Sequence, residues 1–251
     1  MFPVLFQVEN FKFYTSFLTL PLVSLVFIIF SWKRLKEIGY KDTEIGQIMI
    51  LIFVSWAVFS RLYLIGKIPF LQLISVWEGG HSMILGIIGP MIITLVYLLL
   101  RKKTISDFFD AMVPTIALSL ALYRIFVCFL VGCCFGKPFR FGLVFHENSA
   151  AYLYFGSKPI HITQIYEAFF MGLTFFLLEK IKFKEKGDKT LFFLFMLSLM
   201  RLVVDNFRGD IKEFMIKFEI FELQGITLWQ VLSIFLFLCG VFWLRVLKIR
   251  T

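Results

Sequence analysis

Seven apolar stretches constrain this chain more than any other feature of its sequence. A helix needs roughly 20 mostly apolar residues to cross the hydrocarbon core of a bilayer. Because lipid offers no partner for an open strand edge, segments that cross it must be helical. The sequence therefore predicts an all-α, polytopic integral membrane protein with about seven transmembrane helices. These are expected at Phe13–Trp32, Gln47–Leu64, Met83–Leu100, Ala111–Val131, Ile162–Leu178, Leu191–Phe207 and Ile226–Leu244.

The composition excludes a soluble globular domain. Apolar residues make up 59% of the 251 positions, aromatic residues 19% and charged residues only 17%. A soluble domain of this size could not cover so much apolar surface with so few charges. The N-terminus lacks the basic-then-apolar order of a cleaved signal peptide, so the first apolar stretch is expected to be a retained span.

The basic residues predict the orientation in the membrane. Most of the 26 Lys and Arg follow the first, third, fifth and seventh stretches. By the positive-inside rule, the N-terminus faces out and the C-terminus faces the cytoplasm. This topology and anionic inner-leaflet lipid account for the net charge of +9, so nucleic-acid binding is not expected. We expect one membrane domain over residues 1–251, with outer loops around 65–82, 132–161 and 208–225.

Charged residues inside the apolar stretches point to a function. Each would cost at least about 2.5–3.5 kcal/mol facing lipid at a helix centre, and in the expected topology all lie in the outer half of the bilayer. Structural explanations exist: Arg61, near a span end, can snorkel to the headgroups. Arg201 and Asp205, one helical turn apart, can pair with each other, and Glu167 can neutralise Arg124 as a bridge between helices. The arginines nevertheless outnumber the acids, and guanidinium groups donate two parallel hydrogen bonds to phosphate. A phospholipid headgroup site is favoured, built from Arg61, Arg124, Glu167, Arg201 and Asp205.

The histidine and cysteine side chains are further candidates for reactive groups. His81, beside Gly79 and Gly80, is the best candidate for a general base, whereas the other histidines are scattered. No metal site and no cofactor are expected. The adjacent Cys133 and Cys134 are interpreted as small packing residues in a glycine-flanked turn.

Six short motifs then follow one another between about residues 60 and 233. They are Ser60-Arg61, Trp77–Gly80, Gly132–Pro138 (Gly-Cys-Cys-Phe-Gly-Lys-Pro), His161–Glu167, Arg201–Arg208 and Thr227–Ser233. In this order they resemble the motifs of the prolipoprotein diacylglyceryl transferase family, in its cysteine-containing branch.

The resemblance implies an enzyme and its substrates. It implies transfer of a diacylglyceryl group from phosphatidylglycerol to the lipobox cysteine thiol of a prelipoprotein signal peptide. In the family this occurs at the outer face of the bacterial cytoplasmic membrane, and glycerol phosphate leaves. The residues implied as catalytic are His81, Arg124, Glu167 and Arg201, and those implied as substrate-binding are Arg61, Gly79, Gly80, Gln164, Tyr166, Asp205 and Arg208.

The chain also departs from the family pattern. Ile84 occupies the position where the catalytic base is expected, and Arg124 lies one residue further from Cys128 than in the cysteine branch. A non-catalytic or acceptor-altered phospholipid-binding relative is therefore one alternative. Another is a transporter with an outer-leaflet charged site. The transporter is disfavoured because no Gly/Pro breaks interrupt helices at matching positions in two halves.

Overall fold

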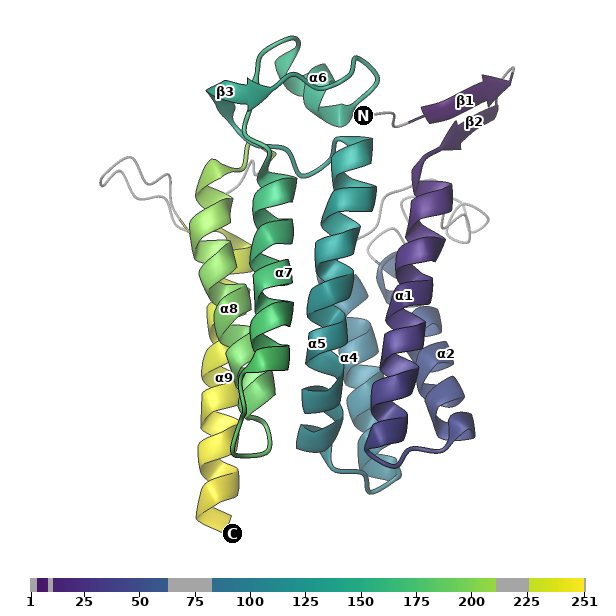
Figure 1. The fold of residues 1–251 in the computed structure, drawn as a ribbon, viewed down its shortest axis with the longest axis vertical. Helices are drawn as coiled ribbons and strands as arrows, with labels where there is room; N and C mark the ends of the chain where they lie inside the picture. Colours follow the sequence, from purple (N-terminus) through teal and green to yellow (C-terminus); the bar gives the residue numbers. More distant parts are fainter. Residues whose placement is uncertain (1–3, 9–10, 63–82, 211–225, 251) are drawn as a thin grey trace. The chain divides into compact units, whose positions relative to one another are not determined.

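A computed structural model of the chain describes residues 4–8, 11–62, 83–210 and 226–250. Each of the seven predicted stretches overlaps a helix over most of its described residues (Figure 1). The corresponding helices are α1 (Ser16–Glu37), α2 (Asp42–Phe59), α4 (Met83–Leu100), α5 (Ile105–Tyr123), α7 (Thr163–Lys180), α8 (Asp188–Val204) and α9 (Leu228–Arg250).

Four of the described helical segments are long and apolar enough to cross a membrane. They are α1, α2, α5 together with a π-helical turn η3 (Arg124–Phe129), and α8 together with a 3₁₀ turn η4 (Asp205–Phe207). Large apolar side chains such as Leu22 and Phe169 are more than 60% exposed, as expected for helices that face lipid. The membrane character is thus confirmed, while the number of seven spans and the orientation stay predictions.

Two helices begin about one turn before the apolar stretches that predicted them. α5 starts at Ile105 instead of Ala111, and α2 starts at Asp42 instead of Gln47. In both cases an acidic first turn precedes the apolar part, and negative charge at a helix N-terminus is stabilised by the helix dipole. Hydropathy alone misses such a turn, although Lys41 N–H donates to Glu44 Oε2 at 3.0 Å as a helix cap.

The described chain divides into two compact units, residues 28–111 and residues 1–27 with 112–251. In the first of these, α4 packs closely on α2. An added Cβ at Gly86 would lie 3.3 Å from the Trp56 ring, and one at Gly89 would collide with Phe59. Small residues allow this close approach between membrane helices. The single-domain organisation stays a prediction.

The other unit is built on α5, α7, α8 and α9. Val113, Ala117, Met171 and Met200 belong to its core, where α5, α7 and α8 meet. α9 runs beside α8 (Figure 1), and Ser198 Oγ on α8 donates to the Ser233 carbonyl of α9 at 2.7 Å. This packing fixes the ends of α5, α7 and α8 that carry the charged residues.

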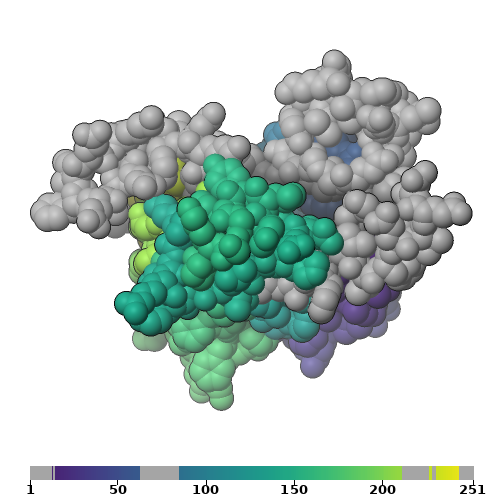
Figure 2. All heavy atoms as spheres, turned by 90° about the horizontal axis from the view of Figure 1, so that it is seen from above, coloured from purple at the N-terminus to yellow at the C-terminus, as the bar shows by residue number. Residues whose placement is uncertain are grey.

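The predicted outer loop 132–161 is folded. It contains strand β3 (Pro138–Leu143) and a short helix α6 (Ala150–Phe155), which pack around Phe135, Phe145 and Ile160. The segment lies above the N-terminal end of α7 (Figure 1), and Figure 2 looks down on its teal surface. Backbone bonds tie it to the end of α8, including Lys137 N–H to the Phe207 carbonyl at 2.8 Å.

Short strands depart from the all-α prediction. Besides β3, strands β1 (Val4–Val8) and β2 (Phe11–Tyr14) form an antiparallel hairpin. They lie outside the apolar helices, where water or neighbouring chain can satisfy backbone groups and the restriction to helices no longer applies.

Candidate active site

Glu167, in the first half of α7, is the centre of a buried ionic cluster. Its side chain is 1% exposed and contacts three arginines from three chain segments. Its Oε2 lies 2.6 Å from Arg124 Nε, and its Oε1 lies 3.5 Å from Nη1 of Arg201 and of Arg208. One carboxylate therefore holds three guanidinium groups within a few ångströms of each other.

Asp205 is the second buried acid and links α8 to α9. Its Oδ1 lies 3.3 Å from Arg201 Nη1 and 4.0 Å from Arg208 Nη1. Thr227, just before α9, donates its hydroxyl to Asp205 Oδ2 at 2.9 Å. The Thr227 hydroxyl also accepts from Gln230 N–H, and Gln230 Oε1 accepts from Thr227 N–H. This reciprocal capping box is readable in the sequence as Thr-x-x-Gln.

Asp210 forms the rim of the cluster. It binds Arg208 through two hydrogen bonds, Nε to Oδ1 at 2.9 Å and Nη2 to Oδ2 at 2.7 Å. Its side chain is 24% exposed, whereas those of Glu167 and Asp205 are fully buried. The excess of positive charge predicted from sequence is thus balanced in the described cluster by an acid at its accessible edge.

The π-helical turn η3 places Arg124 in this cluster. α5 ends at Tyr123, and Arg124–Phe129 continue with hydrogen bonds that span five residues instead of four. Such a turn accommodates one extra residue without changing the direction of the helix. Arg124, predicted to lie one residue further from Cys128 than in the family's cysteine branch, contacts Glu167 from this turn.

The glycine-cysteine turn after η3 is fixed to the start of α7. Gly132 has φ 75° and Cys134 has φ 55°, a left-handed conformation that is uncommon for a residue with a side chain. Two hydrogen bonds of 2.6 Å hold it, from Thr163 Oγ1 to the Cys134 carbonyl and from Gln164 Nε2 to the Cys133 carbonyl. Gln164, predicted to bind substrate, thus supports the turn.

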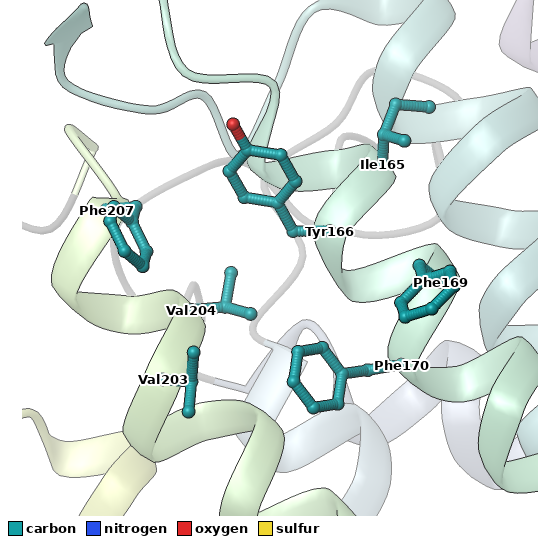
Figure 3. Close-up of a pocket in the computed structure, with 7 residues that line it drawn as sticks. All are labelled: Ile165, Tyr166, Phe169, Phe170, Val203, Val204 and Phe207. Carbon is teal, nitrogen blue, oxygen red and sulfur yellow. The ribbon is translucent and has the colours of Figure 1, made fainter.

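An apolar groove runs between α7 and α8 next to the ionic cluster. Figure 3 shows side chains of the two helices facing one another across it, with the Tyr166 hydroxyl at one end. Its volume is about 370 Å³, and it is lined by Ile165, Tyr166, Phe169, Phe170, Val203, Val204 and Phe207. Tyr166 and Val204 are sequence neighbours of Glu167 and Asp205, so the groove follows the same helical turns as the charges.

His161 lies at the polar end of this groove. Its Nδ1 is 3.2 Å from the Tyr166 hydroxyl, and its ring stacks on Phe139 with centroids 4.0 Å apart. Burial, and then the positive charge of Lys137, lower the pKa of His161 below its ordinary value. The side chain is therefore neutral at pH 7 and able to accept a proton.

Folding stability is expected to fall on acidification through His161. Because the folded protein binds this proton more weakly than the unfolded chain, the stability is complete above about pH 6.5 and is lost progressively below it. Replacing His161 with phenylalanine keeps an aromatic ring against Phe139 and removes the titration. Thermal unfolding in detergent at neutral and mildly acidic pH should show a smaller decrease in Tm for His161→Phe than for the unaltered protein. An equal decrease would contradict this assignment.

The structure brings together some of the predicted site residues and leaves others aside. Arg124, Glu167, Arg201, Asp205 and Arg208 form one cluster, with Tyr166 and Gln164 beside it. Arg61 is buried just after α2 in the other unit, so its grouping with these arginines stays a prediction. Gly79, Gly80 and His81 lie outside the described residues, as does the side chain of Ile84. The sequence alone gave no role to Asp210, Thr163 or His161.

Comparison with known proteins assigns the chain to a family. The family model for prolipoprotein diacylglyceryl transferase matches residues 3–246. A phosphatidylglycerol–prolipoprotein diacylglyceryl transferase of Clostridium tetani is 29% identical, covering 100% of this chain and 99% of that protein. A transferase of the same name from Wigglesworthia glossinidia brevipalpis is 28% identical, covering 95% of this chain and 93% of that protein. One from Rickettsia bellii is 26% identical, covering 86% of this chain and 85% of that protein. The chain therefore belongs to the prolipoprotein diacylglyceryl transferase family.

Proposed function

We propose that this protein transfers a diacylglyceryl group from phosphatidylglycerol to the lipobox cysteine thiol of a prelipoprotein signal peptide. It would act as a multi-pass protein of the bacterial cytoplasmic membrane, with seven spans, the N-terminus outside and the C-terminus in the cytoplasm. Within a chain of this family, the observation that carries the proposal is the buried cluster of three arginines beside an apolar groove.

The chemistry requires stabilisation of a departing phosphate. The thiol sulfur forms a bond to the glycerol carbon of the diacylglyceryl group, and the carbon–oxygen bond to phosphate breaks. The electron pair leaves on the phosphate oxygen of glycerol phosphate, and a base accepts the thiol proton. Arg124 and Arg201 are suited to stabilise the developing negative charge, since donors held in place inside a water-poor site act strongly.

The acids and the remaining polar groups would organise this step. Glu167 and Asp205 orient the arginines through the ion pairs described above. Glu167 also stays a candidate to assist deprotonation of the thiol, because it lies at the centre of the cluster. His81, in the part of the chain outside the described residues, stays a candidate for the same role, and so does the neutral His161.

The groove would hold an acyl chain of the lipid substrate. It is lined by apolar side chains of α7 and α8, two helices with lipid-exposed residues such as Phe169 and Leu202. A lipid whose phosphate lies at Glu167 and its arginines could place a chain along the groove without leaving the hydrocarbon region. Its ester end would then lie near the Tyr166 hydroxyl, the one polar side-chain group that lines the groove.

Filling the groove is expected to weaken lipid use. Val203→Trp inserts a large ring between α7 and α8 and should raise the KM for phosphatidylglycerol about 10-fold, the size of one or two lost apolar contacts. Leu202→Trp, one residue earlier and outside the groove lining, is the matched control and should leave KM unchanged. Steady-state kinetics in mixed micelles measures both; equal effects of the two variants would contradict the acyl-chain role.

Asp210 is expected to compete with the lipid phosphate for Arg208. Its two-point contact occupies the donors that a phosphate would use. Asp210→Asn weakens this competitor and should lower the KM for phosphatidylglycerol by up to about fivefold, the size of a partly exposed ion pair. Glu147→Gln removes an exposed acid from the other outer segment, 132–161, and should not change KM. A higher KM for Asp210→Asn would show that Asp210 supports binding instead.

Reconstitution of the transfer tests the proposed function. Purified protein in nanodiscs would receive labelled phosphatidylglycerol and a lipobox peptide, and mass spectrometry would follow the peptide. The expected result is a diacylglyceryl adduct together with stoichiometric glycerol phosphate. A peptide with serine in place of the cysteine should remain unmodified. Binding of phosphatidylglycerol without any adduct would instead favour a non-catalytic relative.

A further inference from the structure

Three cysteine thiols converge beside Arg124. The sulfur atoms of Cys128, Cys133 and Cys134 all lie within 4.8 Å of one another, and all four cysteines of the chain are free. The cluster has no role in the transfer as described above. The sequence alone assigns Cys133 and Cys134 to packing, as small residues in a glycine-flanked turn.

The backbone turn that brings the three thiols together is strained, and hydrogen bonds hold it in this conformation. Cys134 adopts a left-handed conformation that is unfavourable for a residue with a side chain. The Thr163 and Gln164 hydrogen bonds to the turn offset this cost. The N–H groups of Gly132 and Cys133 both donate to the Cys128 carbonyl, at 2.9 and 3.1 Å. A side chain at Gly132 would strike Ser149, so the turn has little room to adopt another shape.

The spacing of the sulfur atoms suits a thiophilic metal ion. A zinc–sulfur bond is about 2.3 Å, which places three sulfur ligands of one ion about 4 Å apart. Half-buried Cys133 and Cys134 and fully buried Cys128 provide the dry, soft donors that such ions prefer. Three protein ligands leave a fourth tetrahedral position open, as in catalytic zinc sites.

Arg124 provides the charge that a thiolate site needs. Its Nη1 donates to Cys134 Sγ at 3.1 Å and to Cys128 Sγ at 3.4 Å, while its Nε contacts Glu167. A divalent ion with three thiolates carries a net charge of −1, which this guanidinium offsets. The same arginine thus joins the thiol cluster to the ionic cluster.

We propose that Cys128, Cys133 and Cys134 bind a thiophilic divalent ion, with Zn²⁺ as the representative, and that its open position takes the acceptor thiol. The second part rests on the proposed function. A thiol that coordinates such an ion is deprotonated outright. The proton is released to solvent, and the metal-bound sulfur forms the new bond to the glycerol carbon as glycerol phosphate departs.

Metal binding by the purified full-length protein tests the site without reference to activity. Cd²⁺ is the probe, because cadmium thiolates absorb in the ultraviolet by charge transfer. The expected result is one ion per protein, with proton release and an affinity that rises with pH. Cys128→Ser, Cys133→Ser and Cys134→Ser should each weaken binding at least about 10-fold. Cys239→Ser, an exposed cysteine on α9, is the matched control and should bind normally.

Size-exclusion profiles and Tm values of the three Cys→Ser variants should be unchanged, which would show that each variant has lost a metal ligand and not its fold. Absence of stoichiometric binding, or an equal effect of Cys239→Ser, would overturn the proposed site and leave the proposed function intact.

Binding of the acceptor thiol at the fourth coordination position of the metal ion can be measured separately. A lipobox peptide should change the charge-transfer band of the Cd²⁺-loaded protein, and its serine version should not. Chelation should decrease transfer, and Zn²⁺ should restore it. If the peptide does not change the charge-transfer band and the metal-free protein transfers at the full rate, the metal ion does not bind the acceptor thiol. If the metal binds as expected but neither form transfers, the proposed function fails while the metal site stands.

Discussion

Replacing Arg124 with alanine is expected to decrease transfer at least about 100-fold, the size of the loss when one donor to a developing oxyanion is removed. Arg124 is 2% exposed, contacts Glu167 at 2.6 Å and cannot be replaced by water without rearranging the cluster. Arg124→Lys keeps the positive charge beside Glu167 but loses the planar two-point donor. It should therefore fold normally and still lose most of the activity. The peptide mass-shift assay measures both variants.

An exposed arginine of the outer segment 132–161 is the control for this prediction. Arg140 lies on β3 with its side chain in the open, so Arg140→Ala should transfer at the normal rate. The assigned role of Arg124 would be contradicted if well-folded Arg124→Ala kept activity within a few-fold of the unaltered protein.

Replacing Glu167 with glutamine is expected to have the largest effect on stability. The substitution preserves the shape of the side chain and removes the charge that three buried arginines share. Removing one partner of a buried ion pair typically costs about 3–5 kcal/mol, because the remaining charge stays uncompensated. The free energy of unfolding should decrease by about this amount, and transfer should be lost together with the ordered arginines. Thermal unfolding in detergent and the peptide assay measure the two effects.

Glu179→Gln provides the matched comparison on the same helix. Glu179 lies at the opposite end of α7 and is exposed, so its charge contributes little to stability. An equal Tm for Glu167→Gln and Glu179→Gln would show that Glu167 is not the centre of the cluster.

The helical stretches could be predicted from hydropathy because the bilayer allows few alternatives. Each of the seven apolar stretches overlaps a helix over most of its described residues, and Met83–Leu100 coincides with α4. The acidic first turns of α2 and α5 were missed, because a charged residue near the start of a helix lowers the local hydropathy and so indicates a loop. The strands and the course of the chain within segment 132–161 were not predicted, because short elements outside the bilayer leave no long-range pattern in the sequence.

Most charged residues of the site could be predicted from the sequence, because burying a charge in the membrane has a high free-energy cost. Arg124, Glu167, Arg201 and Asp205 stand out because lipid cannot solvate them, and this holds for any sequence of such composition. The pairs Arg201–Asp205 and Arg124–Glu167 could be predicted as structural pairings, the first from its one-turn spacing. The pair Glu167–Arg208 could not, because these residues are 41 positions apart and meet only when α7 packs on α8.

The sequence by itself determined that this chain lies in a membrane and that its charged residues must find partners there, since both follow from the free energy of transfer of each residue. The tertiary structure decided what those partners are. It placed Arg124 in a π turn, paired Asp210 with Arg208, and brought three thiols together beside Arg124. These features depend on backbone geometry and helix packing, which arise from contacts between distant segments that a linear pattern does not contain.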